Sequence, residues 1–142
     1  TLLSLFLFYV FKAITYSIIS KYNNDIRPRI LELTKGKVVE EFSEKTKGID
    51  IAGKLGEPIT AASDGKVVYA GNSLRGYGNL VIIKHDNTYL TAYAHNRNLL
   101  VKEGDAVKKG QTIASVRNAN PSFVHFEVRK GVDSLDPLPY VQ

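Results

Sequence analysis

The chain has no cysteine and no methionine in its 142 residues. Without cysteine it has neither disulfides nor thiolate metal sites, and this absence leaves the redox compartment of the protein undecided. Because the chain starts at Thr1 and has no methionine, we expect it to be a fragment or a processed form.

Charge of one sign is not concentrated in this sequence. Nineteen Lys and Arg against 14 Asp and Glu give a net charge of +5, which suits an acidic partner or an anionic surface. The charges are evenly spread, and there is no recognition-helix pattern and no basic patch interleaved with aromatics, so we expect no nucleic-acid partner. With 44% hydrophobic residues, the composition predicts one globular domain plus a short extension.

A long apolar run occurs only in the first part of the chain. Residues 1–20, TLLSLFLFYVFKAITYSIIS, are mostly apolar, but the uninterrupted run ends at Phe11. That is shorter than the roughly 18 residues of a membrane span and nearer the core of a signal peptide. We expect an export signal or a membrane anchor, with a helix packed on the domain as the alternative. Residues 21–34 are a polar connector that contains Pro28.

From residue 35 onward, short β-rich runs alternate with Gly, Asp, Asn and Pro, and no helix pattern separates them. Such spacing predicts an all-β domain over 35–142, an antiparallel sandwich or barrel. The expected strands are 37–42, 48–52, 58–62, 65–71, 79–85, 88–95, 111–116 and 122–130.

A tight hairpin is predicted where the dipeptide Asp86-Asn87 separates two β-rich runs. A two-residue loop pairs His85 with Thr88. Alternation of side chains then places His95 on one face with Tyr93, and His85 on the other face. We therefore expect His85 and His95 to serve different sites, an argument that depends on the length of the loop.

Two predicted strands carry residues that are suited to a metal. Alternation places His125 on the polar face of one strand and Asp50 on the polar face of another. Catalytic zinc typically has three protein ligands and an open position for water, and the residues alone suggest only these two. Taken by itself, the pattern favours ordinary polar residues at the rim of a groove. Glu127 and Arg129 are expected on a solvated strand face.

Six segments resemble the LytM or lysostaphin-type domain of peptidase family M23. They are KGIDIAG (47–53), AASDGKVVYAG (61–71), GYGNLVIIKH (76–85), YAHN (93–96), VKEGDAVKKGQTIA (101–114) and VHFEVRKG (124–131). The resemblance implies an antiparallel β-sandwich/barrel hybrid over 35–142. It also implies, for active members, zinc held by two histidines and an aspartate, with two further histidines assisting the attacking water.

Compared with that pattern, the chain departs at two positions. The resemblance implies histidines where Thr46 and Phe123 stand, whereas Asp50, His95 and His125 match it. A threonine hydroxyl is a poor zinc ligand, and Phe123 cannot carry a proton. The resemblance therefore implies a degenerate site that is not an enzyme and needs no cofactor. His95 is then a remnant of the catalytic set, and Asp50 and His125 are remnants of the zinc ligands.

Among degenerate relatives, residues 62–96 most resemble the NlpD-type murein hydrolase activators. This resemblance implies a non-catalytic regulator that activates N-acetylmuramoyl-L-alanine amidases during cell separation. It implies a location in the periplasm or cell envelope of a Gram-negative bacterium, with membrane attachment through residues 1–20 and peptidoglycan as further expectations. The amidase-binding groove is then expected to contain Thr46, Asp50, His95, Phe123 and His125.

Two alternatives remain open at the level of sequence. The first is an active zinc endopeptidase that cleaves peptidoglycan cross-bridges with Asp50, His125 and His95 as ligands. The second is a carrier module of the biotinyl or lipoyl type, because residues 101–114 resemble the turns of those small β-sandwiches. Such a carrier needs a modifiable lysine on an exposed hairpin, and the tight hairpin predicted here has Asp and Asn at its tip.

Overall fold

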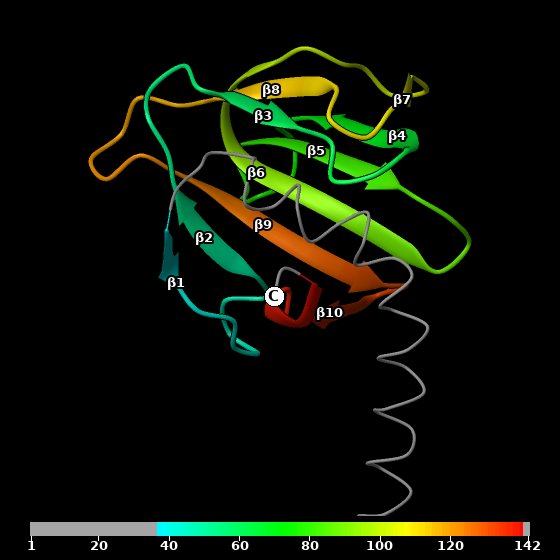
Figure 1. Ribbon diagram of the computed structural model, residues 1–142, viewed down its shortest axis with the longest axis horizontal. Helices are drawn as coiled ribbons and strands as arrows, with labels where there is room; N and C mark the ends of the chain where they lie inside the picture. Colours follow the sequence, from blue (N-terminus) through cyan, green and yellow to red (C-terminus); the bar gives the residue numbers. More distant parts are fainter. Residues whose placement is uncertain (1–36, 141–142) are drawn as a thin grey trace, which may run out of the picture.

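The computed structural model describes residues 37–140, which form an all-β domain (Figure 1). The expectations for residues 1–20 and for the connector 21–34 lie outside the described residues. Within residues 37–140, no helix has the length and apolar character needed to cross a membrane. The elements are β1 (Val38–Glu40), β2 (Ile49–Ala52), β3 (Pro58–Thr60), β4 (Gly65–Gly71), β5 (Asn79–Lys84), β6 (Tyr89–Leu99), β7 (Ala106–Val107), β8 (Thr112–Val116), β9 (Phe123–Lys130), β10 (Asp133–Leu135) and the 3-10 helix η1 (Leu138–Tyr140).

The long strand β6 organises the domain. The strands follow the order β1-β2-β9-β6-β5-β4-β7, and every pairing is antiparallel. We call the strands of this order the larger sheet. The first part of β6 lies in it between β5 and β9, whereas the end of β6 leaves it to pair with β8, which in turn pairs with β3. Figure 1 shows β3 and β8 lying over the larger sheet. This arrangement confirms the predicted sandwich/barrel hybrid. The strands β7 and β10 were not predicted, because two or three residues carry too little alternation to be recognised.

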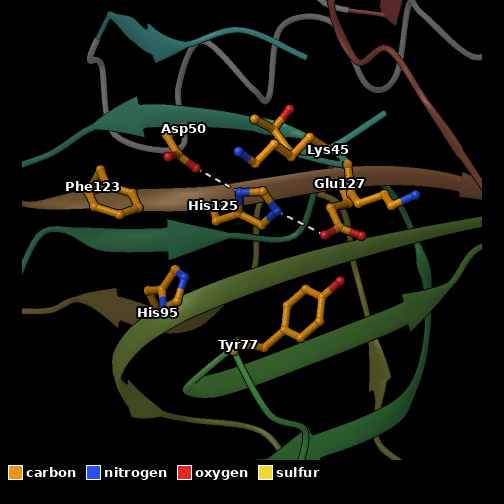
Figure 2. A pocket seen from close by; sticks show the side chains of 10 residues that line it. Lys45, Asp50, Tyr77, His95, Phe123, His125 and Glu127 are labelled. Carbon is orange, nitrogen blue, oxygen red and sulfur yellow. Dashed lines mark hydrogen bonds and ion pairs between the residues drawn. The ribbon is translucent and has the colours of Figure 1, made fainter. Parts of the chain in front are cut away.

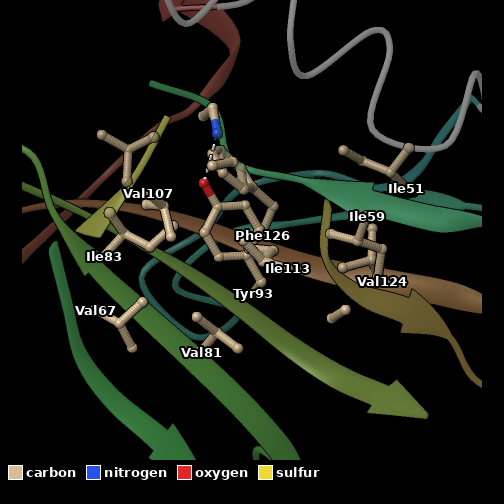
Figure 3. Packing of buried hydrophobic residues seen from close by; sticks show 14 of the residues in the cluster. Ile51, Ile59, Val67, Val81, Ile83, Tyr93, Val107, Ile113, Val124 and Phe126 are labelled. Carbon is tan, nitrogen blue, oxygen red and sulfur yellow. Dashed lines mark hydrogen bonds between the residues drawn. The ribbon is translucent and has the colours of Figure 1, made fainter. Parts of the chain in front are cut away.

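The hydrophobic core lies between the larger sheet and the β3–β8 pair (Figure 3). Val124, Phe126 and Val128 of β9 are fully buried there, as the alternation predicted. The Tyr93 ring packs 5.3 Å from the ring of Phe126, and its hydroxyl accepts a hydrogen bond from the Ala62 N–H at 2.9 Å. Burial raises the pKa of Tyr93 to about 12. The hydroxyl is therefore a neutral, satisfied group inside the core.

The loop of the β5–β6 hairpin has three residues, so the prediction that His85 pairs with Thr88 was wrong. The His85 N–H donates to the carbonyl oxygen of Tyr89 at 3.0 Å. The carboxylate of Asp86 accepts hydrogen bonds from the backbone N–H groups of Thr88 and Tyr89, both at 2.7 Å. This side-chain turn adds one residue to the loop and moves the register by one.

Relative to Tyr93, both histidines of this hairpin lie on the opposite face from the one predicted, because Ile83 pairs with Thr91 and shares the core with Tyr93. The prediction that His85 shares the face of Ile83 is confirmed. His85 points to the core side, where its Nε2 lies 2.7 Å from the Thr91 hydroxyl. His95 sits in a β-bulge of β6 with φ +62°, and the bulge turns its side chain away from the face of Tyr93. His85 and His95 therefore do serve different places, but for reasons that side-chain alternation could not supply.

The bulge at His95 is held by a buried asparagine. Asn96 is 3% exposed, and its side-chain amide donates to the carbonyl oxygens of Asn79 at 2.9 Å and Tyr93 at 2.7 Å. The His95 N–H donates to the carbonyl oxygen of Tyr77 at 2.9 Å. These bonds fix the backbone on both sides of the bulge, so the fold itself sets the direction of the His95 side chain.

Candidate functional site

One pocket on the outer side of the larger sheet brings together all five residues predicted for the groove (Figure 2). We call this pocket the groove. Its lining residues are Lys45, Thr46, Lys47, Asp50, Gly76, Tyr77, His95, Phe123, His125 and Glu127. They come from the turn before β2, from β2, β6 and β9, and from the loop before β5. Half of this set was not predicted, because Lys45, Lys47, Gly76, Tyr77 and Glu127 match no metal-ligand or catalytic pattern.

His125 lies at the centre of the groove between two carboxylates. Its Nδ1 donates to Asp50 at 2.6 Å and its Nε2 donates to Glu127 at 2.8 Å, as the dashed lines of Figure 2 show. Asp50 is placed there because it pairs directly with His125 across β2 and β9. Burial lowers the pKa of His125, but the hydrogen bonds to Glu127 and Asp50 outweigh burial and raise this pKa above its ordinary value. The geometry favours an imidazolium with both N–H groups in use.

Glu127 is buried, so the prediction of a solvated face at this position was wrong. Its side chain is 1% exposed and accepts a hydrogen bond from the Arg129 Nε at 2.6 Å as well as the one from His125. The Arg129 Nη2 also donates to the Tyr77 hydroxyl at 3.2 Å. Burial raises the pKa of Glu127, whereas its two cationic partners lower it, and the net direction is downward. Glu127 is therefore an ionised carboxylate whose charge is fully paired.

Tyr77 lines the groove together with Glu127, and its hydroxyl meets Arg129 there. Its side chain packs against Leu80, Ala92 and Ala94, a small apolar cluster on the groove side of the sheet. The flanking residues Gly76 and Gly78 both have positive φ, +88° and +59°, which lets the loop turn back over the sheet. The loop thereby forms one wall of the groove.

Thr46 occupies the turn that leads into β2. Its hydroxyl accepts a hydrogen bond from the Ser43 N–H at 2.7 Å and lies 3.1 Å and 3.2 Å from the carbonyl oxygens of Glu41 and Gly48. A side chain at Gly48 would place its Cβ 2.3 Å from the carbonyl oxygen of Phe126, so β2 starts in close contact with β9. The Thr46 hydroxyl thus serves the backbone of its own turn.

Phe123 and His95 form the far end of the groove. Their ring centroids are 5.7 Å apart in an edge-on arrangement, and the His95 ring lies 6.2 Å from that of His125. The guanidinium carbon of Arg117 lies 5.6 Å from the centroid of the Phe123 ring. Burial lowers the pKa of His95, and the positive charges of Arg117 and His125 lower it further. His95 is therefore a neutral imidazole beside an aromatic ring.

Donors for a metal ion are few among residues 37–140. No group of three or more His, Cys, Asp or Glu side chains in this part of the chain could hold a metal ion. Both ring nitrogens of His125 are engaged by carboxylates, and Phe123 offers no donor atom.

The proteins similar to the chain include the following two relatives and one solved structure. The lipoprotein NlpD/LppB homolog of Pseudomonas aeruginosa is 59% identical over 111 residues, covering 75% of this chain and 37% of that protein. The murein hydrolase activator NlpD of Escherichia coli is 53% identical over 113 residues, covering 76% of this chain and 30% of that protein. The structure of a zinc containing peptidase from Vibrio cholerae has a TM-score of 0.64 and 30% identity, covering 71% of this chain and 35% of that one.

The chain therefore spans only about a third of the length of these relatives. The sequence model described as peptidase family M23 matches residues 44–137, the part that contains the groove and nearly all of the strands. On this match, and on the identity that the relatives retain across it, the chain belongs to peptidase family M23.

Proposed function

We propose that this domain is a non-catalytic regulator that activates N-acetylmuramoyl-L-alanine amidases during cell separation, and that the groove is its amidase-binding surface. The observation that carries the proposal is the set of residues that line the groove. Its predicted residues are assembled in one place, yet Thr46 and Phe123 stand where an active relative is expected to have histidines. The similarity to proteins named murein hydrolase activators supports the same conclusion.

We propose that the groove works without zinc. The Thr46 hydroxyl is engaged by its own turn, and His125 has no free nitrogen while Asp50 and Glu127 hold it. A zinc ion needs deprotonated ligands, and the raised pKa of His125 opposes the loss of its proton. The groove residues instead offer an aromatic surface at Phe123 with polar groups around it, which suits the docking of a protein segment.

The relatives also suggest where the domain acts. One is named a lipoprotein, and those named NlpD come from Gram-negative bacteria. We propose that this domain works in the periplasm on the cell envelope, with an amidase as its protein partner and peptidoglycan as the polymer that the amidase cuts.

The experiment that tests this function measures dye release from labelled peptidoglycan by an amidase of the same organism, with and without the domain. The parent chain is expected to stimulate release and to release nothing alone.

Phe123→Ala is expected to abolish stimulation while keeping the β fold, as measured by circular dichroism. Loss of a central aromatic anchor typically costs on the order of 2 kcal/mol or more of binding. Lys54→Ala, an exposed position outside the groove, is the control. A folded Phe123→Ala variant that stimulates as well as the parent would show that the groove is not the contact surface.

A second candidate is the active zinc endopeptidase, favoured by the likeness to a zinc containing peptidase. It predicts stoichiometric zinc in the purified domain together with muropeptide release in the absence of any amidase. The regulator predicts substoichiometric zinc and no release. Metal analysis of the protein purified without chelator, run beside the release assay, separates the two.

A further inference from the structure

Arg117 lies at the Phe123 end of the groove. Val116, the last residue of β8, pairs with Asn96, so the next residue emerges beside His95. The guanidinium of Arg117 reaches the ring of Phe123, with 5.6 Å between its central carbon and the ring centroid. Arg117 thereby extends the groove beyond its aromatic end.

The guanidinium of Arg117 lacks an anionic partner within the described part of the chain. Its Nε is buried and has no hydrogen-bond partner there. No Asp or Glu side chain of residues 37–140 forms an ion pair with it. Contact with an aromatic face stabilises a cation but gives the Nε proton no acceptor. Arg117 is half-buried, and of its guanidinium nitrogens only the Nε is both buried and unpartnered, so the Nη edge remains open to an acceptor from outside.

The other charges of the groove point to the same kind of ligand. The carboxylates of Asp50 and Glu127 are already paired with His125, and Glu127 is also paired with Arg129. In the turn before β2, Lys45 and Lys47 are exposed residues of the groove, and within residues 37–140 neither ammonium pairs with a carboxylate. The unpaired charge of the groove is therefore positive, which complements an acidic segment.

We propose that Arg117 binds a carboxylate, and that the amidase segment which enters the groove places an Asp or Glu side chain there, next to an apolar contact with Phe123. The inference rests on the proposed function, since it names the chemistry of the partner at the same groove. A planar guanidinium matches a carboxylate through two parallel hydrogen bonds, a geometry that lysine cannot reproduce. Arg117 thus selects which segment can bind, whereas Phe123 supplies the apolar contact.

The test measures binding of the purified amidase to four forms of the domain at low and high salt. Arg117→Gln is expected to weaken binding by about tenfold or more and to reduce its dependence on salt. Arg117→Lys, which keeps the charge but loses the planar fork, is expected to fall between the parent and Arg117→Gln. Arg97→Gln is the matched control, because Arg97 is an exposed residue of β6 outside the groove, and it is expected to stay within about twofold of the parent.

A second arm verifies the contact itself. Each Asp and Glu on the surface of the amidase is changed to Lys in turn, and the variants are tested against Arg117→Glu. One reversed charge is expected to restore most of the lost binding, while it weakens binding to the parent. Proton NMR of His95, whose ring lies against Phe123, checks that the end of the groove keeps its geometry in every Arg117 variant.

The outcomes separate this inference from the function on which it rests. If Phe123→Ala loses the amidase while folded Arg117→Gln and Arg117→Glu bind like the parent, the groove binds the amidase and the carboxylate inference is overturned. If neither Phe123 nor Arg117 affects binding, both fail. If Arg117 instead governs binding of a purified muramyl tetrapeptide but not of the amidase, the carboxylate belongs to the wall, and the proposed amidase contact at Arg117 is overturned.

Discussion

The two faces of β9 are stabilised by different interactions. On the core face, Val124, Phe126 and Val128 are fully buried and apolar. On the groove face, His125 and Glu127 are nearly as inaccessible, with 12% and 1% of their side chains exposed, yet both are ionisable. The core face is stabilised by the removal of apolar area from water, which is non-directional. The groove face depends on specific partners at specific distances, so each change there leaves another group unpaired.

Side chains on the two faces of β9 are expected to contribute to different properties of the domain. Loss of a core side chain lowers stability and affects the groove only through unfolding. If the groove binds the partner as proposed, loss of a groove side chain affects recognition first, because the hydrogen-bonded polar residues from Asp50 to Tyr77 lie in that groove. Paired substitutions on the two faces can therefore separate folding from function.

The largest expected effect comes from the two phenylalanines of β9. Phe126→Ala removes a fully buried ring that packs on Tyr93, and we expect it to lower the free energy of unfolding by about 3–5 kcal/mol. Phe123→Ala, on the half-buried opposite face, is expected to cost less than about 1.5 kcal/mol. Urea unfolding followed by circular dichroism measures both. Equal losses at the two positions would contradict the separation between the faces.

An intermediate effect is expected at the buried carboxylate. Glu127→Gln keeps the size of the side chain but removes the charge that pairs with His125 and Arg129. We expect a loss of about 2 kcal/mol of unfolding free energy, because hydrogen bonds to charged groups are worth more than neutral ones. Asp50→Asn, at a carboxylate with 21% exposure, is the comparison and is expected to cost less. The order of the two unfolding midpoints in urea is the result to measure, and a reversed order would contradict the paired-charge description of the groove.

A smaller effect concerns pH. The hydrogen bonds to Glu127 and Asp50 outweigh burial and raise the pKa of His125 above 6.5. Burial is the main cause that lowers the pKa values of His85 and His95 below 6.5. The stability that His125 contributes is therefore complete below pH 6.5 and is lost as the pH rises through its folded pKa. The stability linked to neutral His85 is complete above pH 6.5 and is lost as the pH falls towards its folded pKa.

Proton NMR of the three ring signals tests these directions. His125 is expected to titrate last as the pH rises, and Asp50→Asn is expected to lower its midpoint because one of the two carboxylates becomes neutral. A midpoint for His125 below that of His85 would mean that the carboxylates do not hold its proton.

The smallest expected change follows from restoring the two absent histidines. Thr46→His with Phe123→His completes the ligand and proton-carrier set that the family resemblance implies. We nevertheless expect little muropeptide release, because Asp50 and Glu127 still engage both nitrogens of His125. Poorly placed groups around metal-bound histidines commonly cost about 10- to 100-fold in affinity or activity. Zinc analysis and the release assay measure the result, and vigorous release would show that the two substitutions alone separate this groove from an active one.

The sequence allowed the strands and the core face of β9 to be predicted because alternation is a local property. Alternation also placed Asp50 on the polar face of β2, and the structure pairs this residue directly with His125. The loop of the β5–β6 hairpin was predicted one residue too short, because the Asp86 carboxylate captures two backbone N–H groups that the hairpin rule assigns elsewhere. Glu127 was predicted to be solvated because no local pattern shows that Tyr77, fifty residues earlier in the chain, lies in the same groove and meets its partner Arg129.

By itself the sequence determined the all-β class and the faces of β2 and β9, because these follow from the two-residue period of a strand. The family resemblance of the sequence added the expectation of histidines where Thr46 and Phe123 stand. Only the tertiary structure decided that His95 turns into the groove, that Glu127 is a buried anion, and that the Nε of Arg117 is left without an acceptor. A bulge, a buried ion pair and an unpaired donor depend on contacts between segments that are distant in the sequence, and the period of a single strand does not predict them.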